Sequence, residues 1–169
     1  ERIRYFFQNK ARSSGGTKRV AFAEGEEQKI IRAAYQIQEE GIATPVLIGR
    51  ASVIEEHLKN LGLDYKPVIV DPNQFDKLDA YAKAYYELRQ RKGVIASDAP
   101  NKVRDPNIFG SLMVKMGDAD AFISGLTFDY PEVIRPALQI HHTAAGAARA
   151  AGVYIMIVED KVFLFTDAT

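Results

Sequence analysis

The sequence of 169 residues contains no cysteine. This absence excludes disulfide scaffolds, thiolate nucleophiles, zinc ribbons and iron–sulfur sites, all of which depend on cysteine. An excess of charge is missing too, because 22 lysine and arginine residues balance 22 aspartate and glutamate residues. No overall electrostatic field would therefore draw the protein to nucleic acid or to an anionic membrane. The balance of charge does not exclude a local basic site. We predict no nucleic-acid partner.

Long apolar runs are also absent from the sequence. No run approaches the roughly 18 residues that a helix needs to cross a bilayer, and the charged first residues are unlike a secretory signal. We therefore predict a cytoplasmic protein with no membrane partner. Hydrophobic residues make up 47% and charged residues 26%, which is the composition of a globular protein with one good core.

Short apolar segments alternate with amphipathic ones along the first 143 residues. We predict a parallel sheet with helices on both faces, an α/β fold, because each strand is followed by apolar residues at helical spacing. One helix is expected to begin with a capping box formed by Ser52 and Glu55. The predicted strands lie at 19–23, 45–49, 67–70 and 120–124, and the predicted helices at 1–12, 30–41, 52–61, 79–92, 105–117 and 131–140.

The composition changes after residue 143. Residues 144–151 are rich in alanine and glycine, and residues 153–158 and 162–165 predict two strands joined by a turn at 159–161. We therefore divide the chain into a first α/β domain over 1–143 and the opening of an incomplete second domain over 144–169. A hairpin without cover is marginally stable in water, so we expect more chain, or a partner, to cover it.

The parallel architecture places a ligand site beyond the carboxyl ends of the strands. At one such end Ser124, Gly125 and Thr127 precede a helix that contains Arg135. Glycine allows close approach to the backbone, and hydroxyls with free helix amides can hold a phosphate or an acyl oxygen. Ordinary turn chemistry is the alternative interpretation of this loop.

The first strand ends in the acidic segment Glu24-Gly25-Glu26. It lacks the glycine spacing of a dinucleotide fingerprint, and its carboxylates would repel a pyrophosphate. An acidic helix start that complements the helix dipole is the simpler interpretation. This segment therefore does not favour a dinucleotide-binding dehydrogenase as the function.

Two arginines and three histidines are candidate ligand-binding groups. Arg135 lies in an apolar stretch, where it either forms a structural salt bridge or faces a polar cleft. Arg89 belongs to a basic helix end, which suits the helix dipole. The adjacent His141 and His142 point in different directions on a helix, and His57 is remote, so we predict no metal site.

Four strings together resemble the phosphate acetyl/butyryltransferase (phosphotransacetylase) family over essentially the whole chain. They lie at residues 19–26, 110–121, 134–140 and 165–167. The resemblance implies a two-domain architecture like that of isopropylmalate dehydrogenase, with the chain stopping at the start of the second domain. It also implies a homo-oligomer, a dimer or higher, and a site for coenzyme A and acyl phosphate between the domains.

The resemblance further implies ligand roles for Arg89 and Arg135, with Ser124, Gly125 and Thr127 beside them. Guanidinium groups suit phosphate because they are permanently charged, forked donors. The family's catalytic serine–arginine and aspartate motif would lie beyond residue 169. No catalytic residue is therefore assigned within this chain, and the fragment alone is expected to be inactive.

Two functions are consistent with the resemblance. The loop at residues 126–131 carries two rings and an added carboxylate, which favours the acetyl-CoA-binding regulatory domain at the C-terminus of large malic enzymes. The alternative is a catalytic phosphate acetyltransferase or butyryltransferase that moves an acyl group between coenzyme A and phosphate. Acetyl-CoA or CoA is the expected ligand, no cofactor is covalently bound, and NAD(P) with a divalent metal would belong only to an attached malic domain.

Overall fold

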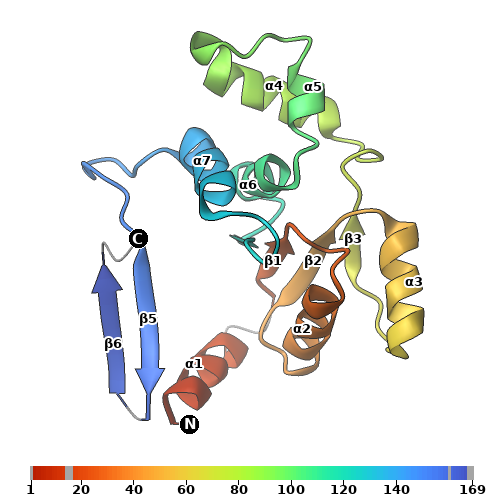
Figure 1. Ribbon diagram of the computed structural model, residues 1–169, viewed down its shortest axis with the longest axis vertical. Coiled ribbons are helices and arrows are strands. Elements are labelled where there is room, and N and C mark those ends of the chain that lie inside the picture. The colour runs from red at the N-terminus through yellow and green to blue at the C-terminus, as the bar shows by residue number, and fades with distance from the viewer. Residues whose placement is uncertain (1, 14–16, 160, 167–169) are drawn as a thin grey trace.

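A computed structural model describes residues 2–13, 17–159 and 161–166, with the side chains of residues 2–4 left aside (Figure 1). Four parallel strands form the central sheet in the order β3-β2-β1-β4. The strands are β1 (Arg19–Phe22), β2 (Thr44–Ile48), β3 (Val68–Val70) and β4 (Ala121–Ile123). This arrangement confirms the predicted parallel sheet.

Alternate strand residues serve two separate cores, because successive side chains of a strand point to opposite faces. Ala21 and Val46 belong to the core on one face. Their neighbours Phe22 and Leu47 belong to the core on the other face. Burial of strands on both sides explains why they are continuous apolar runs rather than alternating ones.

The larger core lies under four helices, α4, α5, α6 and α7, which gather on one side of the sheet in Figure 1. Tyr81, Phe109, Leu112 and Ile140 are completely buried there. Asp105 caps α6 by accepting hydrogen bonds from the amides of residues 107 and 108. The helices are α4 (Leu78–Arg89), continued by a 3₁₀ turn at Gln90–Lys92, α5 (Ala99–Lys102), α6 (Pro106–Met116) and α7 (Tyr130–His141).

The other face is covered by α2 (Gln28–Glu39) and α3 (Ala51–Leu61). Ile31 of α2 and Ile54 of α3 are fully buried against Phe22 and Leu47. The first helix, α1 (Arg2–Ser13), is attached to the end of α2, where Arg12 pairs with Glu40 at 3.5 Å. Helices on both faces confirm the predicted layer order.

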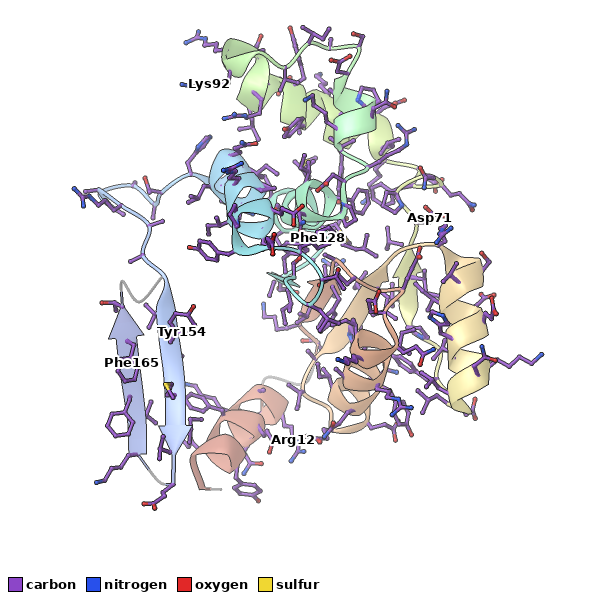
Figure 2. All side chains as sticks on the ribbon, viewed as in Figure 1. Arg12, Asp71, Lys92, Phe128, Tyr154 and Phe165 are labelled. Carbon is purple, nitrogen blue, oxygen red and sulfur yellow. The ribbon has the colours of Figure 1, made fainter. Side chains whose placement is uncertain are left out.

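The hairpin formed by β5 (Val153–Val158) and β6 (Lys161–Thr166) stands apart from the sheet in Figure 1. All of its described side chains are exposed, including Ile155 at 61% and Leu164 at 66%. Figure 2 shows Tyr154 and Phe165 on neighbouring strands, both free of cover. The predicted hairpin is present, while the domain division at residue 143 stays a prediction.

Two local predictions were wrong. Ser52 does not cap α3, because the helix begins one residue earlier and Arg50 occupies the cap position without a side-chain hydrogen bond. The short helix α5 was not predicted. The expected turn at 159–161 and the string ending at Asp167 fall partly outside the described residues. Within the described part of the chain, no helix combines the length and the apolar character needed to span a bilayer.

Candidate functional site

The carboxyl ends of all four sheet strands meet at one edge, since the strands are parallel. Beside β1 the strand order reverses, because β1 lies between β2 and the distant β4. Ligands of open α/β sheets bind outside such a reversal. The structure therefore brings residues 23–27, which follow β1, next to residues 124–128, which follow β4, and the amide of Ala23 bonds the carbonyl of Ile123 at 3.0 Å.

Glu24 joins these two segments. Its carboxylate accepts hydrogen bonds from the amide of Gly125 at 3.1 Å, from the hydroxyl of Thr127 at 2.9 Å, and from the amide of Thr127. The side chain is buried, with only 7% of the residue exposed. The donors that the sequence offered to a phosphate at Gly125 and Thr127 are thus bonded to a carboxylate of the chain itself.

The hydrogen bonds keep this carboxylate ionised. Burial raises the pKa of Glu24, but the backbone donors of residues 125–127 and the Thr127 hydroxyl lower it by more, so the net pKa lies below the ordinary value of 4.5. A carboxylate that accepts several hydrogen bonds favours its charged form. Glu24 is therefore a fixed negative charge at neutral pH, placed where the strand order reverses.

Ser124, at the start of the same loop, is bonded to α6 and not to Glu24. Its hydroxyl donates to the side-chain oxygen of Asn107 at 2.6 Å. Asn107 lies in the first turn of α6 and is 2% exposed, so the sheet edge and α6 are joined by a buried polar contact. The β4–α7 loop thereby has one anchor on α6 and another after β1.

A first cavity of about 310 Å³ opens at the carboxyl edge, lined by residues from the ends of all four strands. Its charges are mixed. Arg50 makes a two-pronged contact with Glu26, at 2.9 Å and 2.7 Å, which lowers the pKa of that carboxyl. The lining is Ala23, Glu24, Glu26, Glu27, Ile48, Gly49, Arg50, Asp71, Pro72, Asn73, Arg104, Pro106, Thr127 and Phe128.

A second cavity of about 240 Å³ lies between α6 and α7 and contains Arg135. The residue is exposed, and no carboxylate of the described residues lies within ion-pair distance of it. The salt-bridge alternative for Arg135 is thus absent from this structure. The same cavity is also lined by two carboxylates, Asp105 and Glu132, and by Asn107, Phe128 and Gln139.

Arg89 is the last residue of α4 and is half-buried. Its Nε atom is buried without a hydrogen-bond partner among the described residues. Helix α4 packs against α6 and α7 on the same face of the sheet, yet Arg89 lines neither of the two cavities. The structure thus places both arginines on one face, while their convergence on one ligand stays a prediction.

The described residues hold no group of three or more histidine, cysteine, aspartate or glutamate side chains that could bind a metal ion. Desolvation of the His141 ring and the nearby Lys115 charge lower the pKa of this histidine, although much of the residue is exposed. His57 instead contacts the carbonyl of Glu26 at 2.7 Å through Nδ1. His57 and His141 therefore lie in different structural settings.

Comparison with known proteins identifies the family of this chain. The model for phosphate acetyl/butaryl transferase matches residues 4–169. The chain belongs to this family. Membership confirms the resemblance that the four strings indicated. They lie in β1 and the turn after it, in α6 and the segment before β4, in α7, and, for residues 165–166, at the end of β6.

Similar proteins include acyltransferases and malic enzymes. Phosphate acetyltransferase from Clostridium acetobutylicum is 39% identical over 157 residues, covering 89% of this chain and 47% of that protein. An NAD-dependent malic enzyme from Rhizobium meliloti is 35% identical over 162 residues, covering 93% of this chain and 21% of that protein. The chain therefore spans about half or less of the length of the relatives it matches.

Solved structures agree with the fold of this family. A phosphotransacetylase from Streptococcus pyogenes superimposes with a TM-score of 0.85 at 32% sequence identity. The match covers 95% of this chain and 50% of that structure. The matched part of this chain thus corresponds to about half of a phosphotransacetylase fold.

Sequence analysis missed two residues of the site. Glu24 was interpreted as part of an acidic helix start, and Asn107 was not singled out. The partners of Glu24 are 101 and 103 residues away, so no local pattern connects them. The available signal was topological: parallel strands put the turns after β1 and β4 at the same edge, where a lone buried carboxylate would need donors.

Proposed function

We propose that this chain supplies one wall of an acyl-transfer site, at which the complete protein moves an acetyl or butyryl group between coenzyme A and phosphate. Family membership and the similarity to phosphate acetyltransferases support the proposal. The observation that carries it is Arg135, an exposed guanidinium without an ion-pair partner among the described residues, in a cavity beside the strand-end loop.

The proposed reaction needs positioning and charge stabilisation more than special chemistry. The thiolate of coenzyme A attacks the carbonyl carbon of an acyl phosphate. The carbon–sulfur bond forms, the bond from that carbon to the phosphate oxygen breaks, and inorganic phosphate leaves. The thiol proton passes to a base that the resemblance places outside these residues. Arg135 would offer forked donors to the phosphoryl group.

Arg135→Ala in the full-length protein tests the proposal. Loss of hydrogen bonds to a charged group costs about 1.5–3 kcal/mol, so we expect kcat/KM to fall about 10- to 100-fold. Release of the coenzyme A thiol from acetyl-CoA in the presence of phosphate is the measurement. Arg32→Ala is the matched control, because Arg32 is an exposed arginine of α2 on the other face of the sheet.

Two results would contradict the proposal. One is a wild-type protein that neither turns over acetyl-CoA with phosphate nor binds it. The other is an Arg135→Ala variant that matches the Arg32→Ala control in kcat/KM. The second result would leave the family assignment intact and remove Arg135 from the site.

One observation favours a second candidate, an acetyl-CoA-binding regulatory domain of a malic enzyme. The Glu24 carboxylate already occupies the donors of Gly125 and Thr127, which leaves the loop poorly suited to a further phosphate. The exposed side chains of Leu126 and Tyr130 add bulk to the same loop. Similarity to the Rhizobium meliloti malic enzyme agrees with this candidate.

Calorimetry separates the two candidates. A regulatory domain binds acetyl-CoA, loses affinity in Arg135→Ala, and gives no thiol release with phosphate. Its effect on an attached enzyme would require different affinities for two states of the oligomer. An acyltransferase gives both binding and turnover.

A further inference from the structure

The β4–α7 loop, residues 124–128, forms a shared wall of the two cavities. Thr127 and Phe128 line the cavity at the carboxyl edge, and Phe128 also lines the cavity that contains Arg135. Figure 2 shows Phe128 between α6, α7 and the sheet. Any displacement of this loop therefore changes the shape of both cavities and the start of α7.

The loop has few apolar anchors of its own. Leu126 is 43% exposed, and Gly125 and Thr127 are exposed as well. Gly125 has a φ of +110°, a conformation that residues other than glycine rarely adopt. The geometry of the loop is fixed instead by hydrogen bonds to two buried side chains, Glu24 on one side and Asn107 on the other.

We propose that Glu24 is a positioning residue, whose carboxylate holds the β4–α7 loop at the sheet edge so that the wall of the ligand cavity keeps one shape. The proposal deepens the acyl-transfer function and rests on it for its catalytic consequence. Glu24 acts on the loop through the amides of Gly125 and Thr127 and the Thr127 hydroxyl.

Only an ionised carboxylate satisfies this arrangement. Three donors converge on its two oxygens, one on Oε2 and two on Oε1. A glutamine of the same shape offers one acceptor oxygen and one NH₂ group. In either orientation of the Glu24→Gln carboxamide, at least one loop amide would face another donor and lose its partner.

The test compares Glu24→Gln with two other variants of the full-length protein. Thr127→Val removes only the hydroxyl contact and keeps both amide bonds, so it should have the smaller effect. Glu56→Gln is the matched control, because Glu56 is an exposed glutamate on α3. Amide hydrogen exchange over residues 124–128 reports the loop, and steady-state thiol release reports kcat and KM for acetyl-CoA.

In Glu24→Gln we expect exchange at Gly125 and Thr127 to become at least 10-fold faster. We also expect kcat/KM to fall about 10- to 100-fold, mainly through kcat, because a misplacement of about 1 Å at a reacting group can cost that much. A purely structural role would lower the unfolding temperature and leave kcat and KM of the folded enzyme unchanged. In the double variant, Thr127→Val should add little to the loss from Glu24→Gln.

Unchanged exchange in Glu24→Gln overturns the proposal, whatever happens to activity. Faster exchange with unchanged kcat and KM also overturns it, because the loop would then be held without consequence for the ligand. If Glu24→Gln fails to fold, Thr127→Val decides, because loss of the hydroxyl contact should change exchange and kcat/KM in the same direction by a smaller factor, and no change in either would overturn the proposal. A wild-type protein without turnover contradicts the acyl-transfer function instead, and the exchange result still decides whether Glu24 holds the loop.

Discussion

Asp118 links α6 to α4 at the amino side of β4. It accepts a hydrogen bond from the Tyr81 hydroxyl at 2.7 Å and pairs with Lys77 at 2.7 Å. Tyr81 is completely buried, and burial together with the nearby Asp118 carboxylate raises its pKa. Lys77 by contrast has a side chain that is 60% exposed. The buried half of this contact should therefore carry most of its stabilising effect.

Asp118→Asn should lower the free energy of unfolding by about 1–2 kcal/mol, because a buried hydroxyl loses a charged acceptor. Lys77→Ala should cost less than about 0.5 kcal/mol, because exposed ion pairs contribute little. Urea unfolding at pH 7 measures both. Equal effects of the two substitutions would contradict this division.

The stability difference between the wild type and Asp118→Asn should depend on pH. Burial raises the pKa of Asp118, but Lys77 and Tyr81 lower it by more, to below its ordinary value of 3.8. A lowered pKa in the folded state favours folding above about pH 4 and loses this contribution as the pH falls. The stability difference between wild type and Asp118→Asn should therefore be full at pH 7 and shrink below about pH 4.

Glu24 and Asp118 also mark the limit of prediction at this scale. Both are acidic residues in turns rich in glycine and acid, and nothing in their neighbours distinguishes them from solvated surface carboxylates. Their partners come from elements 37 to 103 residues away. Chemical type was visible in the sequence, but the partner was set by the tertiary fold.

At the scale of the element, α6 is packed tightly on β4 because Gly110 faces the sheet. A Cβ atom at Gly110 would overlap the ring of Phe122. The glycine therefore costs helix propensity, about 1 kcal/mol relative to alanine, and in exchange allows the helix to lie close to the strand that leads into the site.

Gly110→Ala should destabilise the protein by about 1–2 kcal/mol, because the overlap outweighs the gain in helix propensity. A second substitution, Phe122→Leu, should recover part of the loss by making room. Gly152→Ala is the control, since its Cβ would meet no atom within 4 Å and its backbone is unstrained. Stabilisation by Gly110→Ala alone, seen in thermal unfolding, would refute the close approach.

Most elements could be predicted because their apolar periodicity is strong. Buried strands such as β2 and helices such as α3 lie within about one residue of the expected bounds. The exceptions have physical reasons. Helix α5 has only four residues, one of them a proline, too few for a periodic pattern. Ser52 had the spacing of a capping box, but the turn after β2 starts α3 one residue earlier.

At the scale of the molecule, the sheet carries a core on each face. Ile140 of α7 is completely buried in one core and Ile54 of α3 in the other. Neighbouring residues of the same strands contribute to both, so neither core can open without exposing the back of the other. We therefore expect the described α/β unit to unfold as one cooperative unit.

Ile54→Val and Ile140→Val make a matched test of this unity. Each should cost about 1 kcal/mol, as loss of one buried methylene usually does. The two losses should add within about 0.5 kcal/mol, because the sites lie on opposite faces of the sheet. Circular dichroism during urea unfolding should show both variants shifting the same transition, and a shift of two separate transitions would contradict a shared sheet.

The fold class was predictable as a whole because the alternation of strands and helices admits few arrangements. The hydrogen bonding within the site could not be predicted. The loop of Ser124 follows β4 at the sheet edge, and Arg135 lies within α7 beside the second cavity, while their ligand roles stay predictions. The sequence did not indicate that Glu24 would already occupy the loop amides.

The exposed hairpin also affects how copies of this chain can interact. Two adjacent strands with apolar side chains on both faces, and with backbone edges that no other described strand pairs, form a template on which a second molecule can add strand to strand. A further segment of the protein, or a second subunit, that paired with these edges would remove the template. The tendency of the protein to form cross-β aggregates should therefore report whether the hairpin is covered.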